Sequence, residues 1–564
     1  MPFPPLPLDV FAQPQSHRSA LQKGLDRART RLFVSAALFI LGFLIIAQRL
    51  FDIMYIKGNS EAYLDDRLGP HTLHLGRADV VDRNGEILAT SITTSSLYAN
   101  AQAILDPVEA ARKLMQVMPD FDEQELVKRL TSGKRFIWIA RHLTPNQKAQ
   151  IIRLGIPGLD FMRDQRRVYL YGSLIAHVIG FVDVDGNGLA GLEKGLDERL
   201  RQEDGAVQLA LDLRLQHILH DELQQGIEEF SAIGGNGIIM DVRTGEILAM
   251  VSLPDFDPNR PDTLNKDHLF NRNTLGVYEM GSILKVVNTA LALDSGIATL
   301  SSRFDATQPL KVGRFTITDF HPKNSWLDVR EIFIYSSNIG SARMALKAGA
   351  ERQRAFMEKL GFLSPLSLEL PELGSPLYPT HWREANVITM SYGYSLSLSP
   401  LHLASAIAGI VNDGLRVPPT LLKREEPIKN IKRVIAPDTS AKMRELMHFV
   451  VEEGTGKKGA VAGIYVGGKT GTSNYRKSVG RGYQKKDVRA SFVGFFPEKP
   501  AYVVFITLEC PKASKKTYGF NTAGWNAAPT GGRVIRRMAP LIGLASNMQE
   551  REEQLKSPTI SPKL

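Results

Sequence analysis

A serine followed three residues later by a lysine marks the part of this sequence that could carry chemistry. Ser282 and Lys285 lie within segment 278–288, directly after a glycine and at the start of an apolar run that reaches Leu293. On a helix, positions i and i+3 share a face, so the hydroxyl and the amine would lie side by side. A buried amine that loses its charge can activate such a serine as a nucleophile. Chance alone supplies a Ser-x-x-Lys pair on the order of once or twice in a chain of this length, so the rest of the sequence must decide.

Two further short patterns follow Ser282 along the chain. Ser336-Ser337-Asn338 precedes an expected helix that starts near Ile339, and Lys469-Thr470-Gly471-Thr472 ends the apolar segment 464–468. Ser-x-x-Lys, Ser-x-Asn and Lys-Thr-Gly in this order are the motif set of β-lactamases and penicillin-binding proteins. Each pattern alone carries little weight. All three in order within one expected domain make a chance match rare.

These residue types match what acyl transfer from a peptide requires. The reaction needs a nucleophile, a base, an acid for the leaving amine and donors for the oxyanion. We assign Ser282 as the nucleophile and Lys285, when neutral, as its base. Burial and a nearby second cation would lower the pKa of Lys285, and Lys469 is the candidate for that cation. Ser336 could relay the proton to the departing amine, and Asn338 could hold both Lys285 and the substrate backbone.

The other residues of the motifs are candidates for binding a substrate or a β-lactam. Thr470 and Thr472 could bind a terminal carboxylate. Gly471, which lacks a side chain, would let its strand approach a bound peptide closely. Ser337 is assigned to the same group. The backbone N–H groups of Ser282 and Thr472 are expected to form the oxyanion hole.

The elements expected around these motifs indicate an α/β arrangement. A helix over 215–230 precedes a hairpin whose tight turn spans 243–245, and a helix over 530–544 ends the region. Strands are expected at 207–212, 237–241, 246–252, 464–466, 490–496 and 501–508. Strands at both ends of a helical middle predict one sheet completed by the two chain ends, with helices on its faces.

The region between residues 55 and 205 shows no nucleophile beside a base. Residues 77–89 are expected to form a strand, an Asn-Gly turn and a second strand. Helices are expected over 106–118, 122–131 and 144–154, and a glycine-rich turn at 186–193 leads into a short helix ending near Leu200. A non-catalytic docking or spacer module is the interpretation that fits.

The first fifty residues indicate an exported protein with a membrane anchor. Residues 1–17 are expected to be disordered, and five basic residues between 18 and 31 then precede the uncharged apolar run 32–47. This run is slightly short for a spanning helix of about 20 residues, but apolar residues up to Met54 extend it. A cleaved signal peptide is the main alternative, although no Ala-x-Ala-like site follows the run. The basic residues would keep the N-terminus cytoplasmic and place the remainder in a bacterial periplasm.

The composition excludes several other classes of function. Hydrophobic residues make up 43% and charged residues 23% of the 564, which is ordinary for folded protein. The net charge of +10 favours anionic surroundings without selecting one. Cys510 is the only cysteine, so an intrachain disulfide and a cysteine metal cluster are impossible. Nucleotide-binding loops and His-Glu-x-x-His are absent from the sequence, which lowers the expectation of nucleotide or zinc chemistry.

On these motifs the chain resembles the class B penicillin-binding proteins, and within them the septal, cell-division transpeptidases of the FtsI type. The resemblance runs from the anchor to the final helix. Beyond the three motifs it includes segments 77–89, 167–169, 188–193, 244–249, 252–259, 271–272, 392–394, 454–456 and 491–497. Ala78 stands where the family usually has glycine, Leu170 where proline is common, and Met280 where relatives often have proline.

The resemblance implies a transpeptidase fold of the penicillin-binding and β-lactamase type. Such a fold has an antiparallel sheet with helices on both faces and an all-helical part, preceded here by a single transmembrane helix and an extended α+β pedestal. The expected domains are a cytoplasmic tail 1–31, an anchor 32–50, a pedestal of the dimerisation type 51–205, a transpeptidase domain 206–546 and a C-terminal tail 547–564.

The resemblance also implies a peptidoglycan D,D-transpeptidase of the bacterial inner membrane. Ser282 would attack the penultimate D-Ala of a stem pentapeptide, expel the terminal D-Ala and pass the acyl group to an amine on a neighbouring stem. β-Lactams would acylate Ser282, and no cofactor is needed. Expected partners are a membrane glycan polymerase of the FtsW type and other divisome proteins, reached through the anchor and pedestal, and no nucleic acid is expected.

Several alternatives are weighed against this interpretation. A bifunctional class A enzyme would need a glycosyltransferase domain of roughly 200 residues, more than the pedestal region offers. A soluble β-lactamase would explain neither the anchor nor the pedestal. An elongation-type class B enzyme and a mainly scaffolding divisome component stay open. Residues 319–321 are interpreted as a hydrogen-bonded loop in preference to a metal site, and residues 474–487 as a basic loop.

Overall fold

The computed structural model describes residues 15–51, 76–203, 205–260, 263, 265–313, 315–426, 428, 431–476 and 483–544. The chain forms two compact units, residues 1–75 and 76–564.

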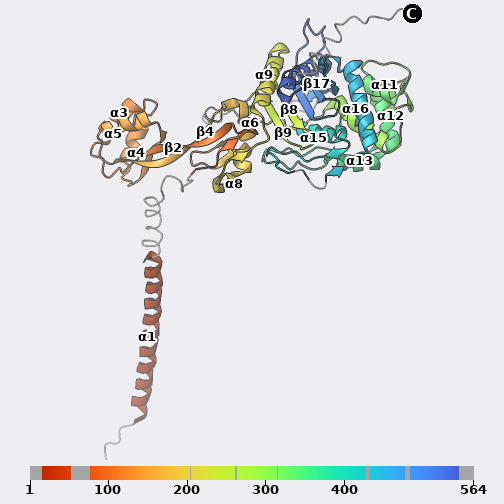
Figure 1. Cartoon of the computed structure of the whole chain (residues 1–564). Helices are drawn as coiled ribbons and strands as arrows, with labels where there is room; N and C mark the ends of the chain where they lie inside the picture. The colour runs from red at the N-terminus through yellow and green to blue at the C-terminus, as the bar shows by residue number, and fades with distance from the viewer. Residues whose placement is uncertain are drawn as a thin grey trace, which may run out of the picture. The chain divides into compact units, whose positions relative to one another are not determined.

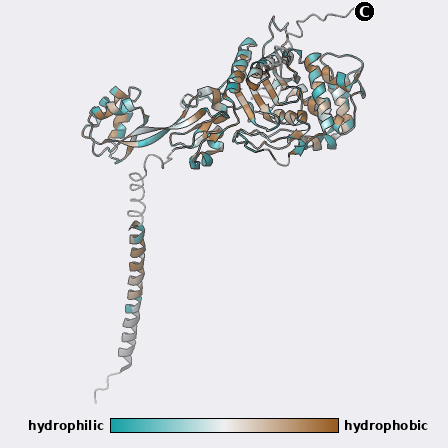
Figure 2. Ribbon diagram, in the orientation of Figure 1, coloured by the Kyte–Doolittle hydropathy of each residue, from teal (hydrophilic) through white to brown (hydrophobic). Residues whose placement is uncertain are grey.

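The first unit contains one long helix, α1 (Gln15–Phe51), and its portion Arg29–Phe51 is long and apolar enough to cross a membrane. Large side chains such as Leu32, Phe39 and Ile45 are 60% or more exposed, and Figure 2 shows the apolar residues running along the C-terminal part of the helix. A helix that is apolar all round with nothing packed on it suits a lipid environment. The predicted span 32–50 lies inside it. The expectation of disorder over residues 1–17 is wrong for residues 15–17, which form the start of α1, and residues 1–14 lie outside the described residues.

The second unit begins with a sheet of short and long strands. It contains β1 (Val80–Val81), β2 (Ile87–Ala99), β3 (Ile137–Leu143), β4 (Leu159–Tyr169) and β7 (Val207–Gln208), in the order β3-β2-β1-β7 with β4 also paired to β2. β1 and β2 are antiparallel around the predicted Asn-Gly turn, in which Gly85 has φ +93°. Asp82 accepts hydrogen bonds from two backbone N–H groups of this turn. The predicted hairpin is therefore confirmed.

Three helices pack beside the far end of β2 and confirm the predicted ones. They are α3 (Pro107–Val117), α4 (Glu123–Leu130) and α5 (Pro145–Arg153). The side chains of Asp106, Asp122 and Thr144 cap their N-termini, which is why local sequence located the helix starts well. Their apolar faces share a small core with Leu97 of β2 and Ile139 of β3.

A buried ion cluster ties distant parts of this region together. Glu193, on α7 (Gly191–Gly195), is fully buried and accepts hydrogen bonds from Arg77 at 2.6 Å and Arg167 at 2.7 Å. Arg77 also pairs with Asp197, on α8 (Asp197–Gln202). Because a buried carboxylate without partners is costly, this cluster fixes α7 against β4.

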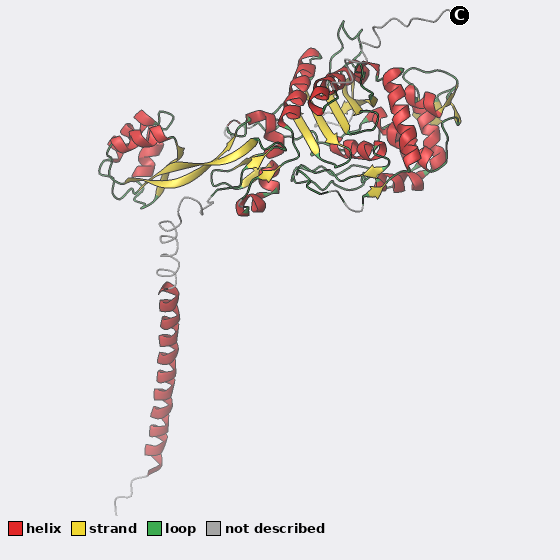
Figure 3. Ribbon diagram, viewed as in Figure 1, coloured by secondary structure: helices red, strands yellow, loops and turns green. Residues whose placement is uncertain are grey.

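The main sheet confirms the predicted assembly from both chain ends. Its strands are β8 (Gly234–Asp241), β9 (Ile247–Leu253), β16 (Gly467–Arg476), β17 (Tyr483–Phe496) and β18 (Tyr502–Glu509), all antiparallel in the order β16-β17-β18-β8-β9. β18, from the end of the chain, pairs with β8, from its middle. Figure 3 shows these strands side by side with helices around them.

Helices cover both faces of this sheet, as predicted (Figure 1). α9 (Leu213–Glu229) and α17 (Ala527–Met538) pack with Ile239 and Ile506 in one core. Ile238 and Phe505 point to the opposite core, which α10 (Leu284–Asp294) and α15 (Pro400–Val411) share. The all-helical part contains α11 (Val329–Ile334), α12 (Asn338–Ala348), α13 (Ala350–Lys359), α14 (Glu384–Met390) and α16 (Pro437–Glu452).

Three predictions about strands need correction. The predicted strand 464–466 is wrong, because the strand starts at Gly467 and carries the Lys-Thr-Gly motif within it. Glycine has a poor strand propensity, so the glycines of this segment obscured the start of the strand. A Cβ at Gly467 would lie 2.3 Å from the ring of Phe495, so this position needs glycine. The strand predicted over 207–212 covers only Val207–Gln208. The predicted basic loop 474–487 belongs at its ends to β16 and β17, and residues 477–482 lie outside the described residues.

The predicted boundary near residue 205 stays a prediction. One hydrophobic core contains Leu88, Tyr169 and Leu200 from before this point and Met240 and Leu291 from after it. Residues 76–564 therefore pack continuously across the predicted boundary.

Candidate active site

Ser282 lies on a one-turn 3₁₀ helix, η4 (Gly281–Ile283), that leads directly into α10. The predicted helix start is confirmed, with a tighter first turn. Gly281 has φ +54°, and a Cβ there would lie 2.5 Å from the carbonyl oxygen of Thr472. Glycine is therefore required both by the turn and by the close approach of η4 to β16. The nucleophile sits directly beside the Lys-Thr-Gly strand.

Lys285 occupies the centre of the site. Its Nζ lies 2.9 Å from Ser282 Oγ, 3.1 Å from Ser336 Oγ and 2.7 Å from Asn338 Oδ1. Burial lowers the pKa of Lys285 well below its ordinary value, the positive charge of Lys469 lowers it further, and Asp319 raises it. An amine held neutral at this position has a lone pair for the proton of Ser282.

Burial is thus the first cause of the lowered pKa of Lys285, ahead of the predicted effect of Lys469. Lys285 is 1% exposed. The burial of a lysine is set by the tertiary packing around it, which the sequence does not show.

Ser336 lies between the two lysines. Its Oγ is 3.1 Å from Lys285 Nζ and 3.0 Å from Lys469 Nζ, and its carbonyl oxygen is 2.6 Å from Lys285 Nζ. The residue has φ +57°, a conformation that costs a residue other than glycine on the order of 1–3 kcal/mol. This backbone presents both the hydroxyl and the carbonyl to one amine. A hydroxyl that contacts both amines suits the predicted proton relay.

Lys469 is fully buried, and burial lowers its pKa to about 7. Two threonine hydroxyls of the same strand are already engaged. Thr470 Oγ1 lies 2.6 Å from Thr455 Oγ1, and Thr472 Oγ1 accepts a hydrogen bond from the Ala523 N–H at 3.1 Å. Because a carboxylate only accepts, each hydroxyl must donate its proton to it. Thr472 Oγ1 accepts from Ala523 and keeps its proton, and Thr470 keeps its proton when Thr455 is the donor.

Asn338 is held at both ends of its amide. Its Oδ1 accepts from Lys285, and its Nδ2 donates to the Thr318 carbonyl at 2.9 Å. The predicted contact with Lys285 is confirmed. Contact with a substrate backbone stays a prediction.

Asp319 is a residue beside the site that the motif pattern missed. Its carboxylate accepts hydrogen bonds from Ser337 Oγ at 2.7 Å and from the N–H groups of Asn338 at 2.6 Å and Ile339 at 3.0 Å. It therefore fixes the Ser-Ser-Asn turn against its own loop. The interpretation of residues 319–321 as a hydrogen-bonded loop is confirmed for Asp319. Among the described residues no group of three His, Cys, Asp or Glu could hold a metal ion.

Ser337 caps α12. Its side chain is 2% exposed, and its Oγ accepts from the Gly340 N–H at 3.0 Å. This placement gives Ser337 a structural role, and its predicted contact with a ligand stays a prediction.

Gly471 is glycine for a reason that the sequence did not show. A Cβ there would lie 2.5 Å from the Met280 carbonyl oxygen and 2.7 Å from the side chain of Ile283. The bare backbone therefore admits the Ser282 turn, whereas we expected it to admit a bound peptide.

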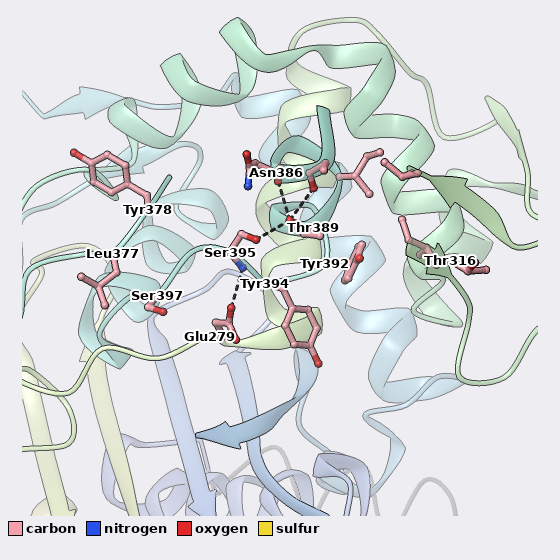
Figure 4. A pocket seen from close by; sticks show the side chains of 14 residues that line it. Glu279, Thr316, Leu377, Tyr378, Asn386, Thr389, Tyr392, Tyr394, Ser395 and Ser397 are labelled. Carbon is pink, nitrogen blue, oxygen red and sulfur yellow. Dashed lines mark hydrogen bonds between the residues drawn. The ribbon is translucent and has the colours of Figure 1, made fainter. Parts of the chain in front are cut away.

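A cavity of about 680 Å³ adjoins the site. Glu279, three residues before Ser282, forms part of its wall, as does Ile317, next to the Thr318 that holds Asn338. Figure 4 shows Glu279 accepting the hydrogen bond from the Ser395 N–H, with Tyr392 and Tyr394 nearby. The other lining residues are Val312, Thr316, Leu377, Tyr378, Ala385, Asn386, Ile388, Thr389 and Ser397.

Glu279 is the only Asp, Glu, Lys, Arg or His among these fourteen described lining residues. One carboxylate among hydroxyls, an amide and aliphatic side chains suits a neutral or cationic ligand group. The cavity therefore contains a negative charge, that of Glu279, whereas the part of the site around Lys469 contains a positive one.

The whole arrangement can perform acyl transfer. A serine hydroxyl lies within hydrogen-bond reach of a buried amine, and a second hydroxyl connects that amine to a second one. This is the geometry of an activated nucleophile with a proton relay.

Comparison with known protein families agrees with this chemistry. Residues 235–525 match the penicillin binding protein transpeptidase domain. Residues 74–228 match the penicillin-binding protein dimerisation domain.

Curated relatives match over most of the chain. A protein of Caulobacter vibrioides named "Probable peptidoglycan D,D-transpeptidase FtsI" is 39% identical over 500 residues, which cover 86% of this chain and 84% of the relative. Peptidoglycan D,D-transpeptidase FtsI of Escherichia coli is 28% identical over 497 residues, covering 82% and 84%. Among solved structures, penicillin-binding protein 3 of Mycobacterium tuberculosis, complexed with aztreonam, has a TM-score of 0.66 at 23% identity and covers 83% of this chain and 96% of its own. The similarity to penicillin-binding protein 3 shows a shared fold only.

Proposed function

The chain belongs to the class B penicillin-binding proteins, and from this premise we propose that it crosslinks stem peptides of septal peptidoglycan through an acyl-enzyme on Ser282. It is a serine-type peptidoglycan D,D-transpeptidase that binds β-lactams and is inhibited by them. The observation that carries the proposal is the convergence of Ser282, Lys285 and Ser336 at 2.9 and 3.1 Å, inside a domain of this family.

The first half of the reaction forms the acyl-enzyme. Ser282 Oγ attacks the carbonyl carbon of the penultimate D-Ala while neutral Lys285 takes its proton. The N–H groups of Ser282 and Thr472 stabilise the oxyanion that forms. The proton then passes from Lys285 through Ser336 to the amide nitrogen, the C–N bond breaks, and the terminal D-Ala leaves as the free amine.

The second half transfers the acyl group. An amine of a neighbouring stem attacks the ester, gives up its proton through Ser336 to Lys285, and the C–O bond to Ser282 breaks as the serine regains a proton. With a β-lactam, the amine released by ring opening stays tethered to the acyl group. It therefore occupies the place that the acceptor amine needs, and the adduct persists.

The two ends of the site orient the donor peptide by charge. The terminal carboxylate lies at Thr470 and Thr472, beside Lys469, since hydroxyl donors and a nearby cation suit an anion. The remainder of the stem then extends toward the cavity that contains Glu279. β16 is an edge strand of the sheet, which leaves its outer side able to pair with an extended peptide.

The membrane anchor determines where the protein is located, and the anchor and the pedestal determine which proteins it contacts. α1 holds the chain in the bacterial inner membrane as a single-pass protein, with the basic residues before the span keeping the N-terminus cytoplasmic and the catalytic domain periplasmic. We assign a membrane glycan polymerase of the FtsW type and other divisome proteins as partners, contacted by the anchor and pedestal. Elongation-type synthesis and a mainly scaffolding role are the alternatives.

Labelling with a fluorescent penicillin tests the enzymatic part. We expect the full-length protein to be labelled and Ser282→Ala to remain unlabelled, with mass spectrometry placing the penicilloyl group on the peptide that contains Ser282. Equal labelling of the alanine variant would refute the assignment. Depletion in cells tests the septal part: filaments are expected, and rounded or bulging cells would favour elongation.

A further inference from the structure

A buried cluster of charged and aromatic residues lies next to the Ser282 turn and takes no part in the reaction described above. Arg489, on β17, is 7% exposed, and its guanidinium carbon lies 3.6 Å from the ring centre of Tyr278 and 5.1 Å from that of Tyr475. Its Nη2 donates to Glu509 at 2.7 Å. Arg272 donates to the other oxygen of Glu509 at 3.3 Å.

The charges of this cluster explain why the aromatic rings are there. Two buried or nearly buried arginines share one carboxylate, which leaves an excess of one positive charge. Burying a charge without compensation is costly. The negative π faces of Tyr278 and Tyr475 offset that excess by cation–π attraction to Arg489. The stack on Tyr278 therefore compensates part of the charge of the buried Arg489.

The stack joins two backbone segments that the reaction needs at a fixed separation. Tyr278 stands four residues before Ser282 in the segment that enters η4. Arg489 is paired in register with Ser473 of β16, the neighbour of Thr472. The N–H groups of Ser282 and Thr472 are the oxyanion donors assigned above.

The surroundings of Tyr278 hold its ring in place, and its hydroxyl contributes little. The Tyr278 backbone exchanges hydrogen bonds with Leu398 at 2.9 Å in both directions. A Cβ on Gly276, whose backbone does not itself require glycine, would lie 2.0 Å from the Tyr278 hydroxyl oxygen. That oxygen is buried and has no hydrogen-bond partner among the described residues. The position of the ring over Arg489 is thus maintained by shape and by the stack.

We propose that Arg489 is a positioning residue for acyl transfer: by stacking on Tyr278 it fixes the Ser282 turn against β16 and so sets the gap between the two oxyanion donors. The proposal rests on the proposed function. Misplacement of a reacting group by about 1 Å can cost roughly 100-fold in rate. Loss of the stack should therefore slow the chemical step while leaving the affinity for the ligand nearly unchanged.

Stopped-flow acylation by a chromogenic cephalosporin tests this, because it separates the acylation rate constant from the dissociation constant of the preceding complex. For Arg489→Gln we expect the rate constant to fall roughly 10- to 100-fold, with the dissociation constant within about threefold of the wild type. Arg489→Lys, which keeps the charge but loses the planar group, should recover part of the rate.

Arg272→Gln is the matched control, since it removes the other partner of Glu509 and leaves the stack on Tyr278 intact. We expect its acylation rate constant to stay within about threefold of the wild type. An Arg489→Gln rate within that same range, or an Arg272→Gln rate as low as that of Arg489→Gln, would overturn the proposal.

A pair of tyrosine variants decides the matter if Arg489→Gln does not fold. Tyr278→Phe keeps the ring and should acylate like the wild type, whereas Tyr278→Leu should be as slow as expected for Arg489→Gln. Equal rates for the two variants would refute a role for the ring. Absence of any adduct on Ser282 in the wild-type protein would instead refute the proposed function, so the two failures are distinguishable.

Discussion

Lys285 and Lys469 contact the same side-chain oxygen, that of Ser336, at 3.1 and 3.0 Å. Both amines are buried, and the positive charge of Lys469 is one of the two causes that lower the pKa of Lys285. The hydroxyl between them can pass a proton without any movement of the backbone. The two lysines therefore act as one unit, in which the charge of one sets the basicity of the other.

The pH dependence of acylation should report this coupling. In Lys469→Ala the like charge is gone, so the pKa of Lys285 rises and the acid limb of the acylation rate moves to higher pH. Because the pKa of Lys469 is about 7, its charge is present mainly below that pH, and the difference should be largest there. Stopped-flow acylation from pH 5 to 9 measures it, and Lys458→Ala, at a lysine over the ring of Trp525, serves as the control. An unshifted acid limb would show that burial alone sets the basicity of Lys285.

Asp319→Asn should shift the same limb in the opposite direction. The Asp319 carboxylate raises the pKa of Lys285, so its loss lowers that pKa and moves the acid limb to lower pH. Asparagine keeps an oxygen for the N–H groups of Asn338 and Ile339, which limits the effect on α12. Asp319→Ala, in contrast, removes a helix-capping group and should lower the free energy of unfolding by about 1 kcal/mol. A shift to higher pH in Asp319→Asn would contradict this account.

Local signals predicted the fold well where the structure is determined locally. The hairpin turn at Gly85 and the helix starts at Asp106 and Thr144 use short-range capping and turn chemistry, and each lies where it was expected. The three motifs likewise predicted which residues meet around Lys285.

Contacts between distant segments were not predictable in the same way. Asp319 accepts a hydrogen bond from Ser337, but no spacing signal in the sequence connects the two residues. The start of β16 could not be predicted because glycine is a poor strand former. The glycines of this strand leave room for Phe495 and for the Ser282 turn. The burial of Lys285 and the stack of Arg489 on Tyr278 depend on how whole elements pack, which composition does not show.

Gly471→Ala, on β16, should lower both the rate of Ser282 acylation and the stability of the fold. The added methyl group would lie 2.5 Å from the Met280 carbonyl oxygen, so η4 must move away from β16. Overpacking of this kind costs about 1–3 kcal/mol of folding free energy, and the displaced serine should acylate at least about 10-fold more slowly. Thermal unfolding and penicillin labelling measure the two effects. Gly205→Ala, at a position with open space around it, should change neither. A Gly471→Ala protein with normal labelling would show that β16 and η4 can separate without loss of function.

Glu279→Gln should alter which donor peptides the enzyme prefers. Glutamine keeps an oxygen for the hydrogen bond from the Ser395 N–H, which is 2.9 Å long, but it removes the only carboxylate among the described residues of the cavity wall. If the stem extends into this cavity, a donor peptide with an ammonium side chain before the two D-Ala residues should lose about 10-fold in kcat/KM, since a charge-assisted hydrogen bond contributes about 1.5–3 kcal/mol.

The matched donor carries a norleucine side chain at the same position and should react equally well with the wild type and Glu279→Gln. Release of D-Ala in the presence of each peptide measures both rates. An equal loss for the two donors would mean that Glu279 only supports the turn through Ser395, and the orientation proposed for the stem would then lack its charge argument. A loss confined to the ammonium donor would assign the cavity to the part of the stem that precedes the scissile bond.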